Sequence, residues 1–194
     1  MSRALAEGWL GVAGKYGEIA AALAADLFDV QAREIGVTPR VQMAESVNDR
    51  QAMSNLGYSL SAIDQLGNAM VALDLLVKKP YRQTMQNSAW ASGAAWARVP
   101  SGSKTCAFCL MLASRGAVYH TSQSAGEGHA YHGDCHCVPA LVRDDRDFPE
   151  GYDPAALYDQ YDVAASSALG QAPRSGKEAT SQVLAQLRQQ QGIH

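Results

Sequence analysis

The stretch Cys106-Ala107-Phe108-Cys109, together with the later run His132-Gly133-Asp134-Cys135-His136-Cys137, decides how the middle of this chain folds. All four cysteines of the protein lie in this one window, as a Cys-x-x-Cys pair and a His-x-x-Cys-x-Cys cluster. Two short ligand-bearing knuckles separated by a loop are typical of a tetrahedral zinc site, where thiolates and a neutral imidazole bind the ion. The sequence therefore predicts a small module stabilised by a metal ion.

The predicted ligands are the cysteines and the histidine of the two knuckles. We favour Cys106, Cys109, His132 and Cys135, and Cys137 can replace His132 or Cys135. A site whose positions are all filled by protein side chains is structural, because no position is left for a substrate. Two alternatives stay open: two disulfides that join one knuckle to the other, or four reduced thiols that act as small core residues. His120 and His129 have no knuckle partner, and we expect them at the surface or beside the ligands.

Length and composition exclude several classes of protein. A chain of 194 residues can bury one core, or form a helical domain with a small appended module. Its 47% hydrophobic and 18% charged residues predict a globular protein. A net charge of -3 without a run of Lys or Arg gives no electrostatic footprint for nucleic acid. Without an apolar span or a secretory signal, we expect a reducing cytoplasm and no membrane partner, which favours zinc over disulfides.

The hydrophobic pattern predicts a mainly α protein. We expect an N-terminal helical domain (1–98), a small α+β module of the cysteine/histidine-knuckle, zinc type (99–143), and an extended and helical C-terminal tail (144–194). In the first domain, helices are expected over Leu5–Ile35, Val41–Met53 and Ile63–Val77, followed by a fourth from Pro80 to just before Pro100. Short strands are expected at Ala117–His120 and Ala140–Val142, with a polar loop over Thr121–Gly128 between them.

Apolar residues at steps of three and four predict which helix faces are buried. The predicted buried positions are Tyr16, Ala20, Leu23, Leu27 and Val30 in the first helix, Ile63, Leu66, Met70, Leu73 and Val77 in the third, and Tyr81, Met85, Trp90 and Trp96 in the fourth. In the tail, Asp153-Pro154 is expected to open a short helix, and Ser175 with Glu178 to form the capping box of a last helix. That last helix has a thin apolar stripe, so we expect it to dock on a partner or to stay mobile.

No catalytic constellation is evident in the sequence. Every cysteine belongs to a knuckle, His-Glu-x-x-His is absent, and no glycine loop precedes Lys104-Thr105 with the spacing of a phosphate-binding loop. Ser114 is the only serine in a suggestive setting, next to Arg115-Gly116, and we interpret it as part of a turn between the first knuckle and a strand.

The central region resembles a known family. The residues that carry the resemblance are Ala97–Gly102, Thr105–Cys109, Leu112–Tyr119 and Tyr131–Pro139, with its HxxCxC cluster. Together they resemble the minor head proteins of tailed phages, the group related to the F protein of Mu-like phages, in the branch found in phages of actinobacteria. The Cys-x-x-Cys, the Ser-Arg-Gly turn and the HxxCxC recur in that order in the family.

The resemblance implies a minor capsid protein of the virion, present in few copies inside the head near the portal and acting in head assembly or genome delivery. Its implied partners are the portal protein, the major head protein and, close by, packaged DNA. It also implies a structural role for Cys106, Cys109, His132, Cys135 and Cys137. Before packaging, the chain would be in the host cytoplasm. Members of this branch are often labelled capsid maturation proteases, and a protease acting on head or scaffold protein is therefore the alternative function.

Overall fold

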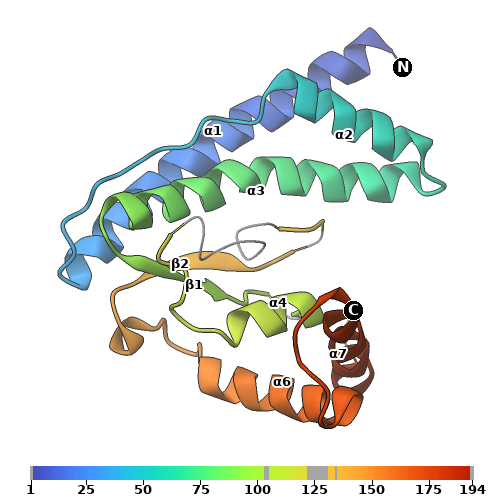
Figure 1. The fold of residues 1–194 in the computed structure, drawn as a ribbon. Coiled ribbons are helices and arrows are strands. Elements are labelled where there is room, and N and C mark those ends of the chain that lie inside the picture. Colours follow the sequence, from blue (N-terminus) through green and yellow to red (C-terminus); the bar gives the residue numbers. More distant parts are fainter. Residues whose placement is uncertain (1, 103–104, 122–130, 134, 193–194) are drawn as a thin grey trace. The chain divides into compact units, whose positions relative to one another are not determined.

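A computed structural model describes residues 2–102, 105–121, 131–133 and 135–192 (Figure 1). The described chain is mainly helical with a small two-stranded sheet, which confirms the predicted fold class. It divides into two compact units, Met1–Ala94 with His129–Asp134, and Ala95–Gly128 with Cys135–His194. His129 and nearly all of the loop predicted over 121–128 lie outside the described residues.

The N-terminal unit is built from α1 (Arg3–Glu34), α2 (Asp49–Ser61) and α3 (Gln65–Ala91). Ser2, Asn48 and Asp64 cap the three helices, each with a side-chain oxygen that accepts a hydrogen bond from a backbone N–H in the first turn. Figure 1 shows α1 and α3 side by side, with α2 packed against them. Trp9 anchors one end of this core, where its indole N–H donates to the Ala52 carbonyl over 2.8 Å.

Residues 37–48 form an extended strap that runs back along α3, where a helix from Val41 was predicted. Three backbone N–H groups of the strap donate to hydroxyl oxygens of α3: Arg40 to Ser92 (2.8 Å), Gln42 to Ser88 (2.8 Å) and Ala44 to Thr84 (2.9 Å). The donors recur every two residues along the strap, a rise of about 6.6 Å, and the acceptors every four residues along α3, a rise of about 6 Å. Because the two spacings nearly match, each donor lies beside its acceptor. The prediction was wrong here because the strap N–H groups are satisfied by α3 side chains instead of by a helix of their own.

Pro80 does not end the third helix, which corrects the prediction of a break and a fourth helix there. A proline inside a helix removes one backbone hydrogen bond and costs about 3 kcal/mol of stability. Packing of the proline ring against a neighbouring helix must offset this cost. Pro80 is buried beside Gly17 of α1, where an added Cβ would lie 3.3 Å from the proline ring. The glycine gives the ring its space, and α3 continues to Ala91.

The buried face of α1 consists mostly of small residues, which corrects the predicted one. The buried residues are Trp9, Ala13, Gly17, Ala21, Ala24, Phe28 and Ala32. Three of the residues predicted to be buried, Tyr16, Leu23 and Val30, are 52%, 61% and 53% exposed. The same holds for Ile63, Leu66 and Met70, which are exposed at the start of the α3 region. Small side chains allow helices to approach closely, and here that close packing overrides the larger apolar stripe.

The C-terminal unit contains a two-stranded sheet and the remaining helices. Its elements are β1 (Ala95–Val99), α4 (Ala107–Ala113), β2 (Val138–Val142), a short 3₁₀ helix η2 (Asp145–Asp147), α6 (Pro154–Leu169) and α7 (Lys177–Gln191). The strands are antiparallel, with Ala95 opposite Val142 and Val99 opposite Val138. The strand predicted at Ala140–Val142 is therefore present. Among the described residues, the one predicted at Ala117–His120 is reduced to a single bridge between Tyr119 and Trp96.

Trp96 lies in β1 and not in a helix, which corrects a further prediction. The chain leaves α3 at Ala91 through Gly93, whose φ of +70° is favourable for glycine, and becomes extended. Trp96 is fully buried as predicted, and its ring stacks on Tyr119 with the centroids 4.4 Å apart.

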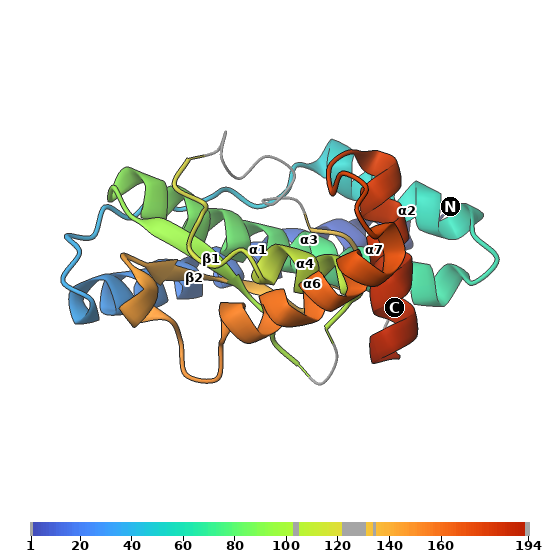
Figure 2. The same ribbon diagram turned by 60° about the horizontal axis from the view of Figure 1, so that its bottom comes forward.

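The helices α6 and α7 pack against each other, and both contact α4 (Figure 2). Their shared core consists of Ala107, Leu110, Ala164, Ala165, Val183 and Leu187. The last helix therefore docks on its own chain, where an external partner or mobility was expected. Asp153 caps α6 as predicted, with a 3.0 Å bond from the Ala156 N–H. The predicted capping box of α7 is absent, since its N-cap is Gly176 with no side-chain bond.

The hydrogen bond between the strap and Ser88 can be tested by mutation. Ser88→Ala removes the acceptor of the Gln42 N–H in a buried position, so we expect the free energy of unfolding to fall by about 1–3 kcal/mol. Urea denaturation followed by circular dichroism measures the loss. The matched control is Ser54→Ala, an exposed serine on α2, which should change the stability by less than about 0.5 kcal/mol. Equal stabilities of the two variants would contradict the role given to the strap.

Candidate metal centre

Three cysteine thiols of the C-terminal unit meet in one buried cluster. Cys109 comes from α4, and Cys135 and Cys137 come from the segment that leads into β2. Their Sγ atoms all lie within 4.8 Å of one another, and those of Cys109 and Cys135 are 3.2 Å apart. The three residues are 1–2% exposed. All four cysteines are free thiols in this structure, and this cluster is a donor set that can hold a metal ion.

Local geometry explains why these thiols converge. Cys106 is the N-cap residue of α4, and its sulfur accepts a 3.3 Å hydrogen bond from the backbone N–H of Cys109. Residues three apart in the first turn of a helix share a face, which brings the Cys106 and Cys109 sulfurs within 4.8 Å of each other. Alternate residues of an extended segment point to the same side, and this places Cys135 and Cys137 together.

Two of the thiols, those of Cys109 and Cys137, lie in an environment that keeps them protonated without a metal. Hydrogen bonds with Cys106, Cys135 and Cys137, followed by burial, raise the pKa of the Cys109 thiol. For Cys137, the hydrogen bond with Cys109 lowers the pKa, but that with Cys135 and burial outweigh it and raise the pKa to about 12. A bound cation reverses this balance, because it favours the thiolates and displaces their protons. Metal binding at this cluster is therefore coupled to proton release.

Arg98 is a charged component of the site that no metal-binding motif in the sequence indicates. It lies in β1 with no exposed surface, and its Nη1 is 3.9 Å from the Cys109 sulfur. Its charge lowers the pKa of Cys137, as the hydrogen bond with Cys109 does, against the effects of Cys135 and burial. A guanidinium is always protonated, so it supplies a permanent positive charge beside a group of developing thiolates. Residues 95–98 of β1 are all buried, so both faces of the strand are covered, and the face that carries Arg98 meets the Cys109 thiol.

Two tyrosine hydroxyls hold the far end of α4. The hydroxyl of Tyr119 donates to the Leu112 carbonyl over 3.0 Å, and that of Tyr152 donates to the Ala113 carbonyl over 2.5 Å. Burial raises the pKa of both phenols, so the protons needed for these bonds stay in place at neutral pH. The helix that carries Cys109 is thus fixed at its C-terminal end, where carbonyls have no partner within the helix.

The predicted histidines have different places in the structure. His132 belongs to residues 131–133, which are grouped with the N-terminal unit, and its Nδ1 is 2.5 Å from the Gly133 carbonyl oxygen. Its participation in a metal site stays a prediction, as does the choice of four ligands among the five residues of the two knuckles. His120 is exposed, in agreement with the surface position expected for it.

Ser114 is in a turn, as predicted. It is the C-cap residue of α4, it is 8% exposed, and its hydroxyl donates to the Met111 carbonyl over 2.9 Å. A hydroxyl that is engaged in this way closes the helix end, and the backbone turns at Arg115 toward Tyr119.

The fold and the thiol cluster define a small, mainly helical protein with a candidate metal centre enclosed in its C-terminal unit. A family model described as VG15 protein matches residues 1–164, so the chain belongs to the VG15 protein family. This membership indicates a phage protein. Comparisons with curated proteins and with solved structures found no match. Among the described residues, no helix combines the length and the apolar character needed to cross a membrane.

The cluster predicts thiolate coordination of a divalent metal. Titration of the reduced protein with Co²⁺ should produce sulfur-to-cobalt charge-transfer absorption in the near ultraviolet, and the affinity should rise with pH, because bound thiolates must first lose their protons. Cys109→Ser, Cys135→Ser and Cys137→Ser should each lower the affinity on the order of a hundredfold or more. The Co²⁺ affinities of His132→Ala and Cys106→Ser, measured in parallel, show which of these two residues is the fourth metal ligand. Undiminished absorption in all three cluster variants would contradict the site.

The charge of Arg98 gives a second prediction for the same site. Arg98→Met should weaken Co²⁺ binding and move its pH midpoint upward, because removal of the guanidinium raises the pKa of Cys137 further. The matched control is Arg188→Met, an exposed arginine on α7, which should bind as the unchanged chain does. An unshifted midpoint in a folded Arg98→Met protein would show that the arginine has only a packing role.

Proposed function

We propose that this chain is a minor head protein of a tailed phage, of the MuF-like kind, and that it acts inside the head near the portal in head assembly or genome delivery. The observation that carries the proposal is the match of residues 1–164 to the VG15 family, which indicates a phage protein. The resemblance of the Cys-x-x-Cys and HxxCxC region to minor head proteins supplies the finer assignment.

The closed character of the thiol cluster supports a structural role over a catalytic one. Its three sulfurs belong to residues that are 1–2% exposed, so a substrate has no access to them. Structural metal sites are filled by protein ligands, whereas catalytic ones keep a position open for water or substrate. The C-terminal unit has short strands and a seven-residue α4, which are elements that gain much from a bound ion.

Zinc is the metal that we propose for this centre. Three thiolates with a fourth ligand from Cys106 or His132 form one of the ligand sets that zinc prefers. Such a complex carries a net negative charge, and the buried guanidinium of Arg98 offsets part of it. Binding of a structural zinc ion contributes on the order of ten kcal/mol of folding free energy at neutral pH, because the unfolded chain has no preformed site.

The alternative function, a capsid maturation protease, gains no support from the position of Ser114. Its hydroxyl is bonded to the Met111 carbonyl and the residue is 8% exposed, whereas a nucleophile must reach a substrate and be activated by an adjacent base. Contact with packaged DNA is also not favoured at the metal centre, because Arg98 is fully buried there and cannot reach a phosphate. The partners that we propose are the portal protein and the major head protein.

Quantitative mass spectrometry of purified mature particles tests this function. We expect the intact chain at a small, fixed ratio to the portal protein, together with zinc in an amount equal to that of the chain. Particles assembled with the Cys109→Ser variant should contain less of the chain, while particles with Ser54→Ala as the matched control should contain the usual amount. Absence of the chain from mature particles, or its presence only as fragments, would contradict a minor head role and favour transient action during assembly.

A further inference from the structure

The α1 helix has a second apolar face, which is exposed. We call it the outer stripe, and it consists of Val12, Tyr16, Ile19, Leu23, Leu27 and Val30, which follow each other at steps of three and four. Leu5, 44% exposed, lies on the same side of the helix seven residues before Val12 and outside this run. These side chains are between 38% and 61% exposed. Scattered apolar residues are normal on a protein surface, but six in one row on a single helix form a continuous patch of the kind that marks an interaction site.

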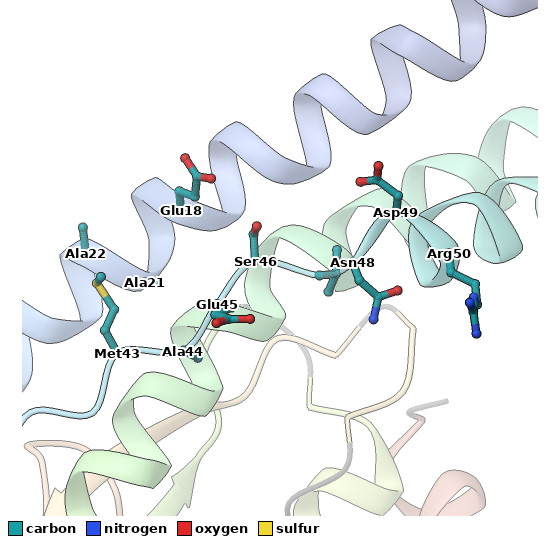
Figure 3. Close-up of a pocket in the computed structure, with 11 residues that line it drawn as sticks. Glu18, Ala21, Ala22, Met43, Ala44, Glu45, Ser46, Asn48, Asp49 and Arg50 are labelled. Carbon is teal, nitrogen blue, oxygen red and sulfur yellow. The ribbon is translucent and has the colours of Figure 1, made fainter.

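The geometry of the outer stripe is that of a helix–helix seam. Its residues follow each other at steps of three and four, and at 100° per residue they lie within an arc of about 80° and extend over about 27 Å. The strap does not cover this arc. Residues 43–50 border a groove of about 960 Å³ whose α1 wall is Glu18, Ala21 and Ala22, on a different side of the helix (Figure 3).

Two opposite charges flank the outer stripe along one edge. Lys15 and Asp26 are both exposed, and at 100° per residue they lie on the same side of the stripe. Within the part of the chain that the structure describes, neither has an ion pair, whereas Arg3–Glu7 and Arg33–Asp29 are paired along the same helix.

These charges and the stripe share a midpoint. The stripe from Val12 to Val30 is centred at position 21, and Lys15 and Asp26 are centred between positions 20 and 21. In an antiparallel pair of identical helices, residues of the same edge face each other across the two-fold axis. An axis between positions 20 and 21 therefore overlaps the two stripes to within one residue of their full length and places each Lys15 opposite Asp26 of the second copy.

The same register interleaves the apolar side chains. Leu27 of one copy lies opposite position 14 of the other, between Val12 and Tyr16, and Leu23 lies opposite position 18, between Tyr16 and Ile19. Each large side chain thus meets a space between two others, which is the requirement of knobs-into-holes packing. The two faces would bury on the order of 1,000 Å² in total, which is at the lower end for specific interfaces and indicates a reversible association.

We propose that the outer stripe is a dimerisation surface, on which the α1 helices of two copies of this chain pack antiparallel about a two-fold axis. The proposal rests on the exposure, spacing and charge pattern of α1 and is independent of the location of the protein in a phage particle.

Analytical ultracentrifugation of the full chain over the micromolar range tests the surface. We expect a monomer–dimer equilibrium, and Leu23→Glu should raise its dissociation constant at least about tenfold, because it places two charges in the apolar seam. The matched control is Ala185→Glu, an exposed position on α7 outside the proposed seam, which should leave the constant unchanged. Circular dichroism verifies that both variants keep the helix.

A charge swap tests the register, and it remains informative if Leu23→Glu fails to fold. Lys15→Glu and Asp26→Lys alone should each raise the dissociation constant roughly fivefold, and the double variant should restore it, because the opposite charges are then exchanged across the axis. A parallel pair would show no such restoration. A wild-type chain that stays monomeric, a control as damaging as Leu23→Glu, or a double variant without restoration would each overturn the proposal. If the chain is monomeric, the occupant of the outer stripe is a different protein and not a second copy.

Discussion

A helix of seven residues has no stable structure by itself in water, so α4 exists because of what surrounds it. Ala107 and Leu110 pack into the core shared with α6 and α7, and Ala113 packs into the core beside the sheet. Between these contacts lies Cys109, and the last carbonyls are held by tyrosine hydroxyls. The C-terminal unit is therefore organised around α4, and a metal ion at the cysteines would fix its first turn as the tyrosines fix its last. This is why a helix so short can position a ligand.

The parts of the fold that the sequence predicted are those set by local chemistry. The Cys-x-x-Cys spacing, the Asp153-Pro154 helix start and the Ser114 turn each depend on neighbouring residues, and the structure contains all three features. The buried face of α1 could not be predicted in this way. Its outer side has the larger apolar residues at helical spacing, while the packed side is rich in alanine and glycine, so hydrophobic periodicity favours the wrong face.

Other features of the structure follow from long-range contacts that no local pattern reveals. Pro80 continues a helix only because a glycine 63 positions earlier leaves space for its ring. Arg98 falls at the end of a predicted helix, and only the pairing of β1 with β2 shows that it lies in a buried strand beside the Cys109 thiol. The cysteine spacing indicates where a metal could bind. The positive charge that offsets the thiolates belongs to Arg98, which is part of no metal-binding motif. Electrostatic compensation of buried ligands is a property of the fold and not of the ligand spacing.

The strap also constrains the order in which the chain can acquire its structure. Its backbone donors lie at positions 40–44 and their hydroxyl acceptors at 84–92, so the two sides are separated by at least 40 residues of sequence. During synthesis the strap emerges from the ribosome well before its acceptors, and α1 emerges earlier still. Until α3 is complete, the growing chain exposes both faces of α1, the small-residue face as well as the outer stripe. A nascent chain with this topology has a period of increased risk of aggregation that lasts until α3 is complete and covers the small-residue face of α1.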